Sequence, residues 1–223
     1  MIISITFDDC CASVATKAAP IFKEYGVAGT FFVCGAYVGK SADVACTCKV
    51  KCPAPVTLDQ LHALKDAGWE IASHTYNHCH GGKVTLEQYE ESVKKNRHWI
   101  EYNGLGDGSG FSYPWGVYTE RLIGVVERYH KYARATVARL ESKRPERYRR
   151  RGVVLSASTT LGAACRHIDQ REPFDNVVFF GHRIGPERDG YTWSPAELRG
   201  LLDYCSRLGI PVAPMGKAPL RDN

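Results

Sequence analysis

Residues 2–9 read IISITFDD. Apolar and β-branched side chains dominate residues 2–7, which is typical of a buried strand. Two carboxylates, Asp8 and Asp9, follow the strand directly. A buried strand that ends in reactive side chains is the first unit of a pattern that recurs along the chain.

The pattern is an alternation of strands and helices. We expect strands at 2–7, 28–33, 69–72, 111–113, 132–135, 153–156, 177–180 and 211–213. We expect helices at 14–25, from Thr57 to just before Gly68, at 85–102, 119–130 and 194–208. Such alternation predicts a mainly parallel sheet with helices outside it. Either a closed barrel or an open doubly wound sheet satisfies the pattern, and no boundary divides residues 1–223 into more than one domain.

Composition excludes several classes of protein. The chain has 223 residues, 44% of them hydrophobic and 24% charged, which is ordinary for a globular protein and excludes intrinsic disorder. No apolar run approaches the ~18 residues of a membrane span. The N-terminal MIISITFDD carries carboxylates where a secretory signal would still be apolar. A cytoplasmic protein is therefore favoured over a secreted one, and the alternative is that this sequence is a processed or trimmed chain.

The net charge of +5 resides in one segment, KRPERYRRR at 143–151. A nucleic-acid-binding protein more often spreads its basic residues over a face, so we expect no nucleic-acid partner. A solvated loop is the favoured interpretation of this segment, and an arm that holds an anionic substrate is the alternative.

Nine cysteines is a high and odd number. Cys46, Cys48 and Cys52 form a C-x-C-x3-C segment that, with Cys79 or His80, would suit a small structural zinc site. Free thiols, or one or two surface disulfides, fit the irregular spacing better. An odd number also fits a reducing compartment slightly better.

The candidate reactive side chains all follow predicted strands. They are Asp8 and Asp9 after the first strand, His74 and His78 after the third, Pro114 and Trp115 after 111–113, and His182 after 177–180. In barrels and in open α/β sheets, the carboxyl ends of the strands carry the active site. We therefore expect these side chains to meet.

A divalent metal ion explains the residue types. Two buried carboxylates repel each other, and a dication beside them removes that penalty. Histidines four residues apart are a ligand spacing of zinc sites, which use about three protein ligands and one open position. His74, His78 and one aspartate supply three ligands, and the other aspartate is then available as a base. Zinc is the expected ion, with cobalt, nickel or manganese also accepted by such ligands.

The motifs Thr6–Asp9, Gly29–Val33 and Gly68–His78 together resemble the polysaccharide deacetylase family, carbohydrate esterase family 4, with its NodB homology domain. The resemblance implies a distorted (β/α) barrel of about seven strands and the metal-dependent removal of acetyl groups from an acetylated glycan. It also implies that Asp8 is the general base and that Asp9, His74 and His78 bind the metal.

Two further motifs extend the resemblance. Pro114-Trp115-Gly116 is similar to the third motif of the family, where the backbone N–H after proline helps to bind the oxyanion. Phe180-Gly181-His182 resembles the last motif, which implies that His182 is the general acid. We expect Pro114, Trp115 and Tyr76 to bind substrate. Tyr113, Tyr191 and Trp193 would also suit a sugar groove, and several of these aromatic residues would equally suit the core.

The chain departs from the family at two places. Ser112 stands where the family has an arginine that braces the catalytic aspartate, and we expect Arg134 to replace that arginine in the catalytic site. The usual aspartate partner of the acid histidine has no clear counterpart, and Asp169 and Glu172 are weak candidates. Two alternative functions therefore stay open: a related metal-dependent amide or ureide hydrolase, and a catalytically impaired carbohydrate-binding homologue. The sequence indicates neither the glycan nor the oligomeric state.

Overall fold

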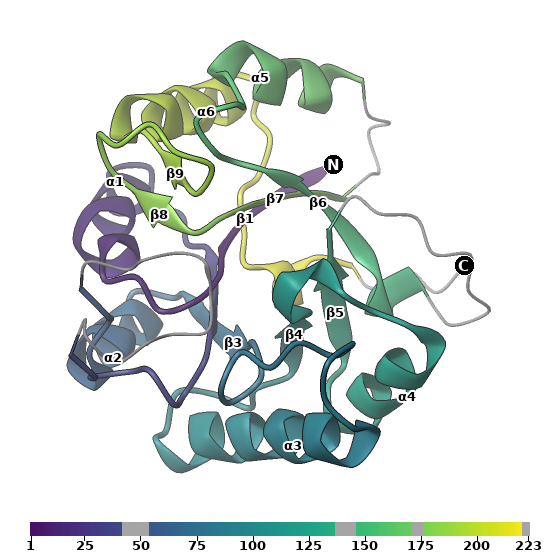
Figure 1. Cartoon of the computed structure of the whole chain (residues 1–223). Helices are drawn as coiled ribbons and strands as arrows, with labels where there is room; N and C mark the ends of the chain where they lie inside the picture. Colours follow the sequence, from purple (N-terminus) through teal and green to yellow (C-terminus); the bar gives the residue numbers. More distant parts are fainter. Residues whose placement is uncertain (42–53, 137–145, 171–175, 220–223) are drawn as a thin grey trace.

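A closed barrel of seven parallel strands forms the centre of the molecule (Figure 1). The computed structural model describes residues 1–41, 54–136, 146–170 and 176–219. The strands are β1 (Ile2–Phe7), β2 (Thr30–Val33), β3 (Glu70–Ser73), β4 (Gly110–Ser112), β5 (Tyr132–Ala135), β6 (Arg150–Val154) and β7 (Asn176–Gly181). Their order in space is their order in sequence. This confirms the expected barrel and excludes the open sheet.

The closing contact joins β1 to β7. The two strands pair in parallel along their whole length, from Ile2 opposite Asn176 to Phe7 opposite Gly181. Their carboxyl ends are therefore level with each other. This register brings the segment after Phe7 beside the segment after Gly181, where the reactive side chains of both motifs begin.

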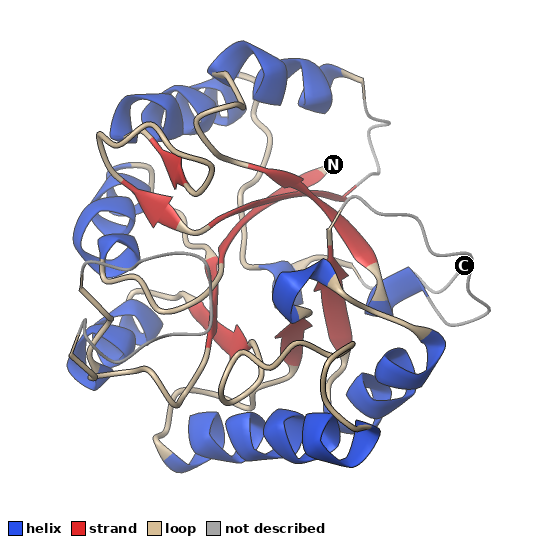
Figure 2. Ribbon diagram, in the orientation of Figure 1, coloured by secondary structure: helices blue, strands red, loops and turns tan. Residues whose placement is uncertain are grey.

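Helices surround the barrel on the outside (Figure 2). They are α1 (Ala19–Glu24), α2 (Leu58–Asp66), α3 (Leu86–Tyr102), α4 (Glu120–Tyr129), α5 (Leu161–Asp169) and α6 (Pro195–Arg207). A π-helical turn, η1 (Val14–Ala18), leads into α1. Thr57, Thr85 and Ser194 begin α2, α3 and α6 with reciprocal capping boxes, which satisfy backbone N–H groups that a helix leaves unpaired. None of the helices among these described ranges is long and apolar enough to cross a bilayer.

Alternation along the strands separates two sets of side chains. Phe7, at an outward position of β1, packs against Phe22 of α1 and against Trp69, in the main hydrophobic cluster. The residues that alternate with this outward set point the other way, into the barrel. Phe32 and Tyr132 belong to this inward set and form a separate small cluster.

The C-terminal segment closes the amino-terminal end of the barrel. Met215, in the short turn η4 (Met215–Lys217), is fully buried among inward-facing side chains, and its N–H donates to Thr30 Oγ1 at 2.8 Å. The strand predicted at 211–213 is wrong, because Val212 forms only a single bridge with Ile3. Strand β2 pairs with β1 from Thr6 onward. The same edge of β1 is therefore open to Val212 at Ile3 but not to a longer C-terminal strand.

Other parts of the chain differ from expectation. Strand β6 begins three residues earlier than predicted, because Arg150 is accommodated in it by donating to the Pro219 carbonyl oxygen. Helix α5 was not expected, nor was the two-stranded ribbon of β8 (Arg183–Ile184) and β9 (Thr192–Trp193). The Cys46, Cys48 and Cys52 segment and residues 143–145 of the basic run lie outside the described residues.

Candidate active site

The predicted reactive residues meet at the carboxyl end of the barrel. Asp8, Asp9, His74, His78 and His182 line one cavity of about 280 Å³. The sequence brings them there through alternation, because Asp8 continues the inward positions of β1 and His182 those of β7. The site therefore lies at the end of the barrel opposite the C-terminal plug.

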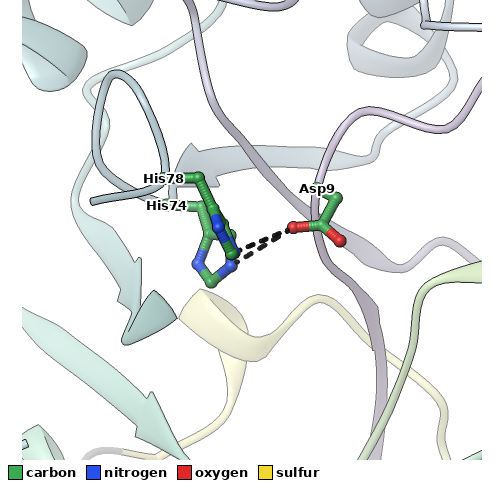
Figure 3. A group of neighbouring side chains, drawn as sticks. All are labelled: Asp9, His74 and His78. Atoms are coloured by element: carbon green, nitrogen blue, oxygen red, sulfur yellow. Dashed lines mark ion pairs between the residues drawn. The ribbon is translucent and has the colours of Figure 1, made fainter. Parts of the chain in front are cut away.

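Asp9, His74 and His78 form a compact set of donor atoms (Figure 3). Asp9 Oδ1 lies 3.2 Å from Nε2 of His78 and 3.6 Å from Nε2 of His74, and the three donor atoms lie within 4.8 Å of one another. All three residues are buried. Within the described ranges this is the one cluster of such residues that could hold a metal ion.

The backbone at this site is held in an unfavourable conformation. Among the residues that the structure describes, the four non-glycine residues with positive φ are Asp9 (69°), Thr75 (58°), His78 (54°) and Trp115 (63°). Such conformations cost on the order of 1–3 kcal/mol each and persist where the surrounding structure fixes them. Their gathering at the cavity indicates that the turns are shaped for the placement of side chains rather than for stability.

The hydrogen bonds of His74 suit a metal ligand. Its Nδ1 lies 2.7 Å from the carbonyl oxygen of Ser112, which can only accept a hydrogen bond. The Nδ1 therefore carries the proton, and the lone pair is on Nε2, which faces Asp9. A histidine oriented by a backbone carbonyl in this way is typical of metal sites.

The charges of the cluster also fit a cation. Burial, and then the neighbouring Asp8 carboxylate, raise the pKa of Asp9 to about 8. Burial lowers the pKa of His74 and brings that of His78 to about 2, so both imidazoles are neutral ligands at neutral pH. The chain alone leaves the Asp9 charge uncompensated, and a divalent ion would compensate it. Imidazole and carboxylate donors in this number suit zinc and the other metals expected from the sequence.

Asp8 is bound by an arginine from another strand. Arg134 of β5 is buried, and its Nη2 donates both to Asp8 Oδ2 and, at 2.6 Å, to Ser112 Oγ. Ser112 Oγ lies 3.4 Å from the same carboxylate oxygen. The guanidinium also lies 4.3 Å from the centroid of the Phe180 ring. Arg134 therefore has the position that was expected of a replacement for the missing arginine.

The surroundings keep Asp8 ionised. Burial by itself raises the pKa of this carboxyl, but the charge of Arg134, with His74 and His182, outweighs burial and places the pKa below its usual value. Asp8 Oδ1 is buried and accepts no hydrogen bond from any described residue. The side chain thus presents one ionised, unengaged oxygen to the cavity, as a proton acceptor requires.

His182 is held by aromatic rings. Its ring packs edge to face against Tyr191, with centroids 5.4 Å apart, and against Phe180 at 6.2 Å. Its Nδ1 is buried, and no group in the described part of the chain forms a hydrogen bond with it. Burial lowers the pKa of His182 to about 4, although Asp8 opposes this shift. At neutral pH the imidazole is therefore uncharged and can take up and release one proton.

The expected carboxylate partner of His182 is not found. Asp169, at the end of α5, instead accepts a hydrogen bond from the Tyr204 hydroxyl of α6, in the outer layer of helices. That suggestion was wrong, because α5 places the side chain outside the barrel. Glu172 lies outside the described residues.

Trp115 reaches the cavity through a tight turn, η2 (Pro114–Gly116). Its indole Nε1 lies 3.4 Å from the His78 carbonyl oxygen, and its ring lies 5.3 Å from that of His78. Gly116 has φ of 66°, and a Cβ there would lie 2.6 Å from Thr136 Oγ1. Glycine is thus required for two reasons, its backbone angle and its contact with Thr136.

Only some of the predicted aromatic residues reach the cavity. Tyr113 and Tyr191 line it, as Trp115 does. Tyr76 does not, because its ring faces Lys95 Nζ at 4.2 Å. Trp193 is 1% exposed and belongs to the hydrophobic core. Pro114 is buried and starts the turn without lining the cavity.

Three residues of the site were not identified from the sequence. Phe180 and Thr136 line the cavity, and Ser112 contributes its hydroxyl beside Asp8. A signal for Thr136 exists in the sequence, because it stands two residues after Arg134 and four after Tyr132, and so continues the inward positions of β5 one residue past the end of that strand. In the sequence, Ser112 was noted only as the position where the family has an arginine, and its hydroxyl was given no role.

Comparisons with known proteins identify the family of the chain. A model of the family described as polysaccharide deacetylase matches residues 1–133. The putative polysaccharide deacetylase YxkH of Bacillus subtilis (strain 168) is 25% identical over 124 residues, which cover 56% of this chain and 40% of YxkH. The chain thus matches less than half the length of this curated relative.

Solved structures share the fold. A family 4 acetyl xylan esterase from Clostridium thermocellum, in complex with a cobalt ion, superposes with a TM-score of 0.67 at 16% identity, over 98% of this chain and 90% of that one. BA3943 from Bacillus anthracis, a pseudoenzyme of the same family, gives 0.65 at 12%, over 97% and 64%. An esterase and a pseudoenzyme have this fold in common, so activity must be argued from the residues of the site.

Proposed function

Because the chain belongs to the polysaccharide deacetylase family, we propose that it is a divalent-metal-dependent hydrolase that removes acetyl groups from an N- or O-acetylated carbohydrate. One observation carries the proposal: a donor set of Asp9, His74 and His78 shares a cavity with an ionised Asp8 that Arg134 holds in place. A metal ligand set and a separate base are the two parts that metal-assisted hydrolysis needs from a protein.

Asp9, His74 and His78 would hold the ion. When bound, a divalent ion supplies Lewis-acid polarisation of the acetyl carbonyl and makes water more acidic. The chain contributes a rigid set of three donors, with His74 fixed in the correct tautomer by the Ser112 carbonyl oxygen.

Asp8 serves as the general base in this proposal. Its Oδ1 accepts the proton of the attacking water, while Oδ2 stays bound to Arg134 and Ser112. The buried guanidinium keeps the carboxyl ionised and fixes the direction of its free oxygen. General base catalysis of this kind contributes typically 10²- to 10⁴-fold to a rate.

Trp115 and His182 serve the two remaining steps of the proposed reaction, stabilisation of the oxyanion and protonation of the leaving group. The backbone N–H of Trp115 donates to the developing oxyanion, and one such donor is worth about 3–4 kcal/mol. His182, uncharged at neutral pH, takes up the water proton that Asp8 has accepted and passes it to the leaving nitrogen or oxygen, which leaves both residues in their starting protonation states. Both residues line the cavity that holds Asp8.

The lining of the cavity supports a sugar as the substrate. Trp115 and Tyr191 line a cavity of about 280 Å³, whereas the ring of Tyr113, which also borders it, packs in a hydrophobic cluster. Trp115 contacts His78 and Tyr191 contacts His182, so the rings stand beside two different parts of the reactive centre. Aromatic faces suit the apolar faces of pyranose rings.

One observation favours a second candidate, a catalytically impaired carbohydrate-binding protein. His182 Nδ1 has no hydrogen-bond partner in the described ranges, so no carboxylate of those ranges orients the proposed acid. In this alternative the chain retains the fold, and with it the metal site, without efficient turnover.

Acetate release tests both candidates. Zinc-loaded protein is incubated with acetylated chitooligosaccharide and with acetylated xylan, and acetate is measured in a single turnover and at steady state. Release from either substrate supports the proposal. Binding of the glycan without release supports the impaired homologue, and cleavage of ureides alone would assign the chain to a different class of metal hydrolase.

A further inference from the structure

Two buried thiols connect the loops that carry the metal donors. Cys10 Sγ lies 3.3 Å from the backbone carbonyl oxygen of Cys34, and the N–H of Cys34 donates back to Cys10 Sγ at 3.3 Å. Both residues are free cysteines, 3% and 1% exposed. The contact joins the segment after β1 to the segment after β2.

Each thiol belongs to a residue directly linked to a metal donor, Cys10 by a peptide bond to Asp9 and Cys34 by a hydrogen bond to the backbone of His74. Cys10 directly follows Asp9, whose φ of 69° is unfavourable for a non-glycine residue. Cys34 Sγ donates to the backbone carbonyl oxygen of His74 at 3.1 Å. A continuous path therefore runs from Asp9 through Cys10 and Cys34 to His74, across the ends of three neighbouring strands.

We propose that Cys10 and Cys34 act as positioning residues, a thiol clip that holds Asp9 and His74 in the geometry that binds metal. The proposal rests on the proposed function only in taking Asp9 and His74 as metal donors. The thiols themselves contact neither metal nor substrate.

The physical basis is the backbone at Asp9. A left-handed conformation persists there only if its surroundings fix it. The two-way contact between Cys10 and the backbone of Cys34 fixes the residue immediately after that turn. Groups that orient metal ligands typically contribute 10- to 100-fold to metal affinity. Purely apolar packing would not require the sulfur atoms to face these backbone groups.

Matched variants separate hydrogen bonding from packing. Cys10→Ser and Cys10→Ala differ only in a hydroxyl group, as do Cys34→Ser and Cys34→Ala. Zinc affinity is measured by competition with a chromogenic chelator. We expect the alanine variants to bind zinc about tenfold more weakly than wild type, and the serine variants to retain most of the affinity. Cys205→Ala, a buried thiol of α6 in the main hydrophobic cluster, is the control and should leave zinc affinity unchanged.

Equal zinc affinity of the serine and alanine variants at both positions would overturn the proposal. Zinc binding is measured without substrate, so a protein that binds zinc normally and releases no acetate contradicts the proposed function and leaves the thiol clip intact.

A measurement on the wild-type protein covers the case in which an alanine variant does not fold. Free thiols are alkylated slowly by N-ethylmaleimide with and without zinc, and the modified cysteines are mapped by mass spectrometry. Because coupling between two sites is reciprocal, zinc should slow modification of Cys10 and Cys34 by a larger factor than that of Cys205. The same factor at all three thiols would reflect only overall stabilisation by zinc and would contradict the proposal.

Discussion

Arg134 of β5 reaches across the barrel to bind the carboxylate of Asp8 at the end of β1. Its register partner on β4 is Ser112, the position at which the family resemblance calls for an arginine. Neighbouring register positions on adjacent parallel strands point to the same side of the sheet. An arginine on β5 can therefore reach the same carboxylate as an arginine on β4. Ser112 occupies the β4 position, and its hydroxyl contacts both Arg134 and Asp8.

The first prediction concerns the charge of Arg134. In Arg134→Gln, burial of Asp8 is no longer opposed by its main counter-charge, so the pKa of Asp8 rises. Because the base must be ionised, the acidic limb of kcat/KM against pH should move upward by about 1–3 pH units. The measurement is a pH profile of acetate release with zinc-saturated enzyme.

A swap of the two strand positions is the matched control. The double variant Ser112→Arg with Arg134→Ser places the guanidinium where the family pattern has it, and we expect it to recover activity that Arg134→Ser alone loses. An unshifted acidic limb in Arg134→Gln would remove Arg134 from its role beside Asp8.

The second prediction separates the two aspartates. Asp8→Asn should lower acetate release by about 10²- to 10⁴-fold, because the amide cannot accept the proton of water. Zinc content should stay at the wild-type level, since Asp9, His74 and His78 remain. Asp9→Asn should lose zinc. If Asp8→Asn loses the metal instead, the two roles have been exchanged.

The third prediction concerns the proton given to the leaving group. His182→Ala should lower deacetylation of an N-acetyl substrate by about 10²- to 10⁴-fold, because an amine leaves poorly without a proton. The rate on an aryl acetate, whose phenolate leaves without protonation, should fall much less in the same variant. Comparable losses on both substrates would show that His182 does not act as the acid. Zinc affinity serves as the control and should not change.

The fourth prediction is a pH dependence of stability away from the site. His130 is buried, its Nδ1 lies 2.8 Å from the Gly108 carbonyl oxygen, and burial lowers its pKa from 6.5 to about 3. At pH values between about 3 and 6.5, His130 binds a proton in the unfolded chain but not in the folded one. The free energy of unfolding therefore decreases as the pH falls through this range. Between pH 7 and pH 5 this group should account for a loss of about 2 kcal/mol.

His130→Asn tests the assignment, because its amide can replace the Nδ1–H donor but does not titrate. Urea unfolding of the metal-free protein at both pH values should show a smaller difference in the variant. A residual pH dependence is expected from His78 and His182, which burial also keeps neutral. An unchanged difference would contradict the prediction.

The fifth prediction concerns the plug at the amino-terminal end of the barrel. Met215 is fully buried against inward-facing side chains such as Phe32 and Tyr132. Met215→Ala should lower the free energy of unfolding by about 2–5 kcal/mol, because it leaves a cavity. Leu208→Ala, at a side chain that is 54% exposed, is the control and should change it by less than about 0.5 kcal/mol. Similar effects of the two variants would show that the C-terminal segment does not seal the barrel.

Much of the site could be predicted from the sequence, because its residues follow strands directly. Asp8, Asp9, His74 and His78 lie next to strands with clear apolar patterns, and parallel strands bring such positions to one end. The positions of Tyr76 and Trp193 could not be predicted, because an aromatic residue is equally suited to a groove and to a core. Strand β6 was misplaced because its first two residues are arginines, which have no apolar pattern to mark a strand.

The order of most strands and helices and the types of metal ligand could be predicted from the sequence, because both depend on local pattern and on residue chemistry. The tertiary structure was needed to show that the sheet closes, that Arg134 binds Asp8 while Asp169 lies outside the barrel, and that Cys10 and Cys34 meet beside Asp9 and His74. These relationships depend on register between strands and on the side of the barrel to which each side chain points. Those quantities join residues far apart in the chain, and no local pattern contains them.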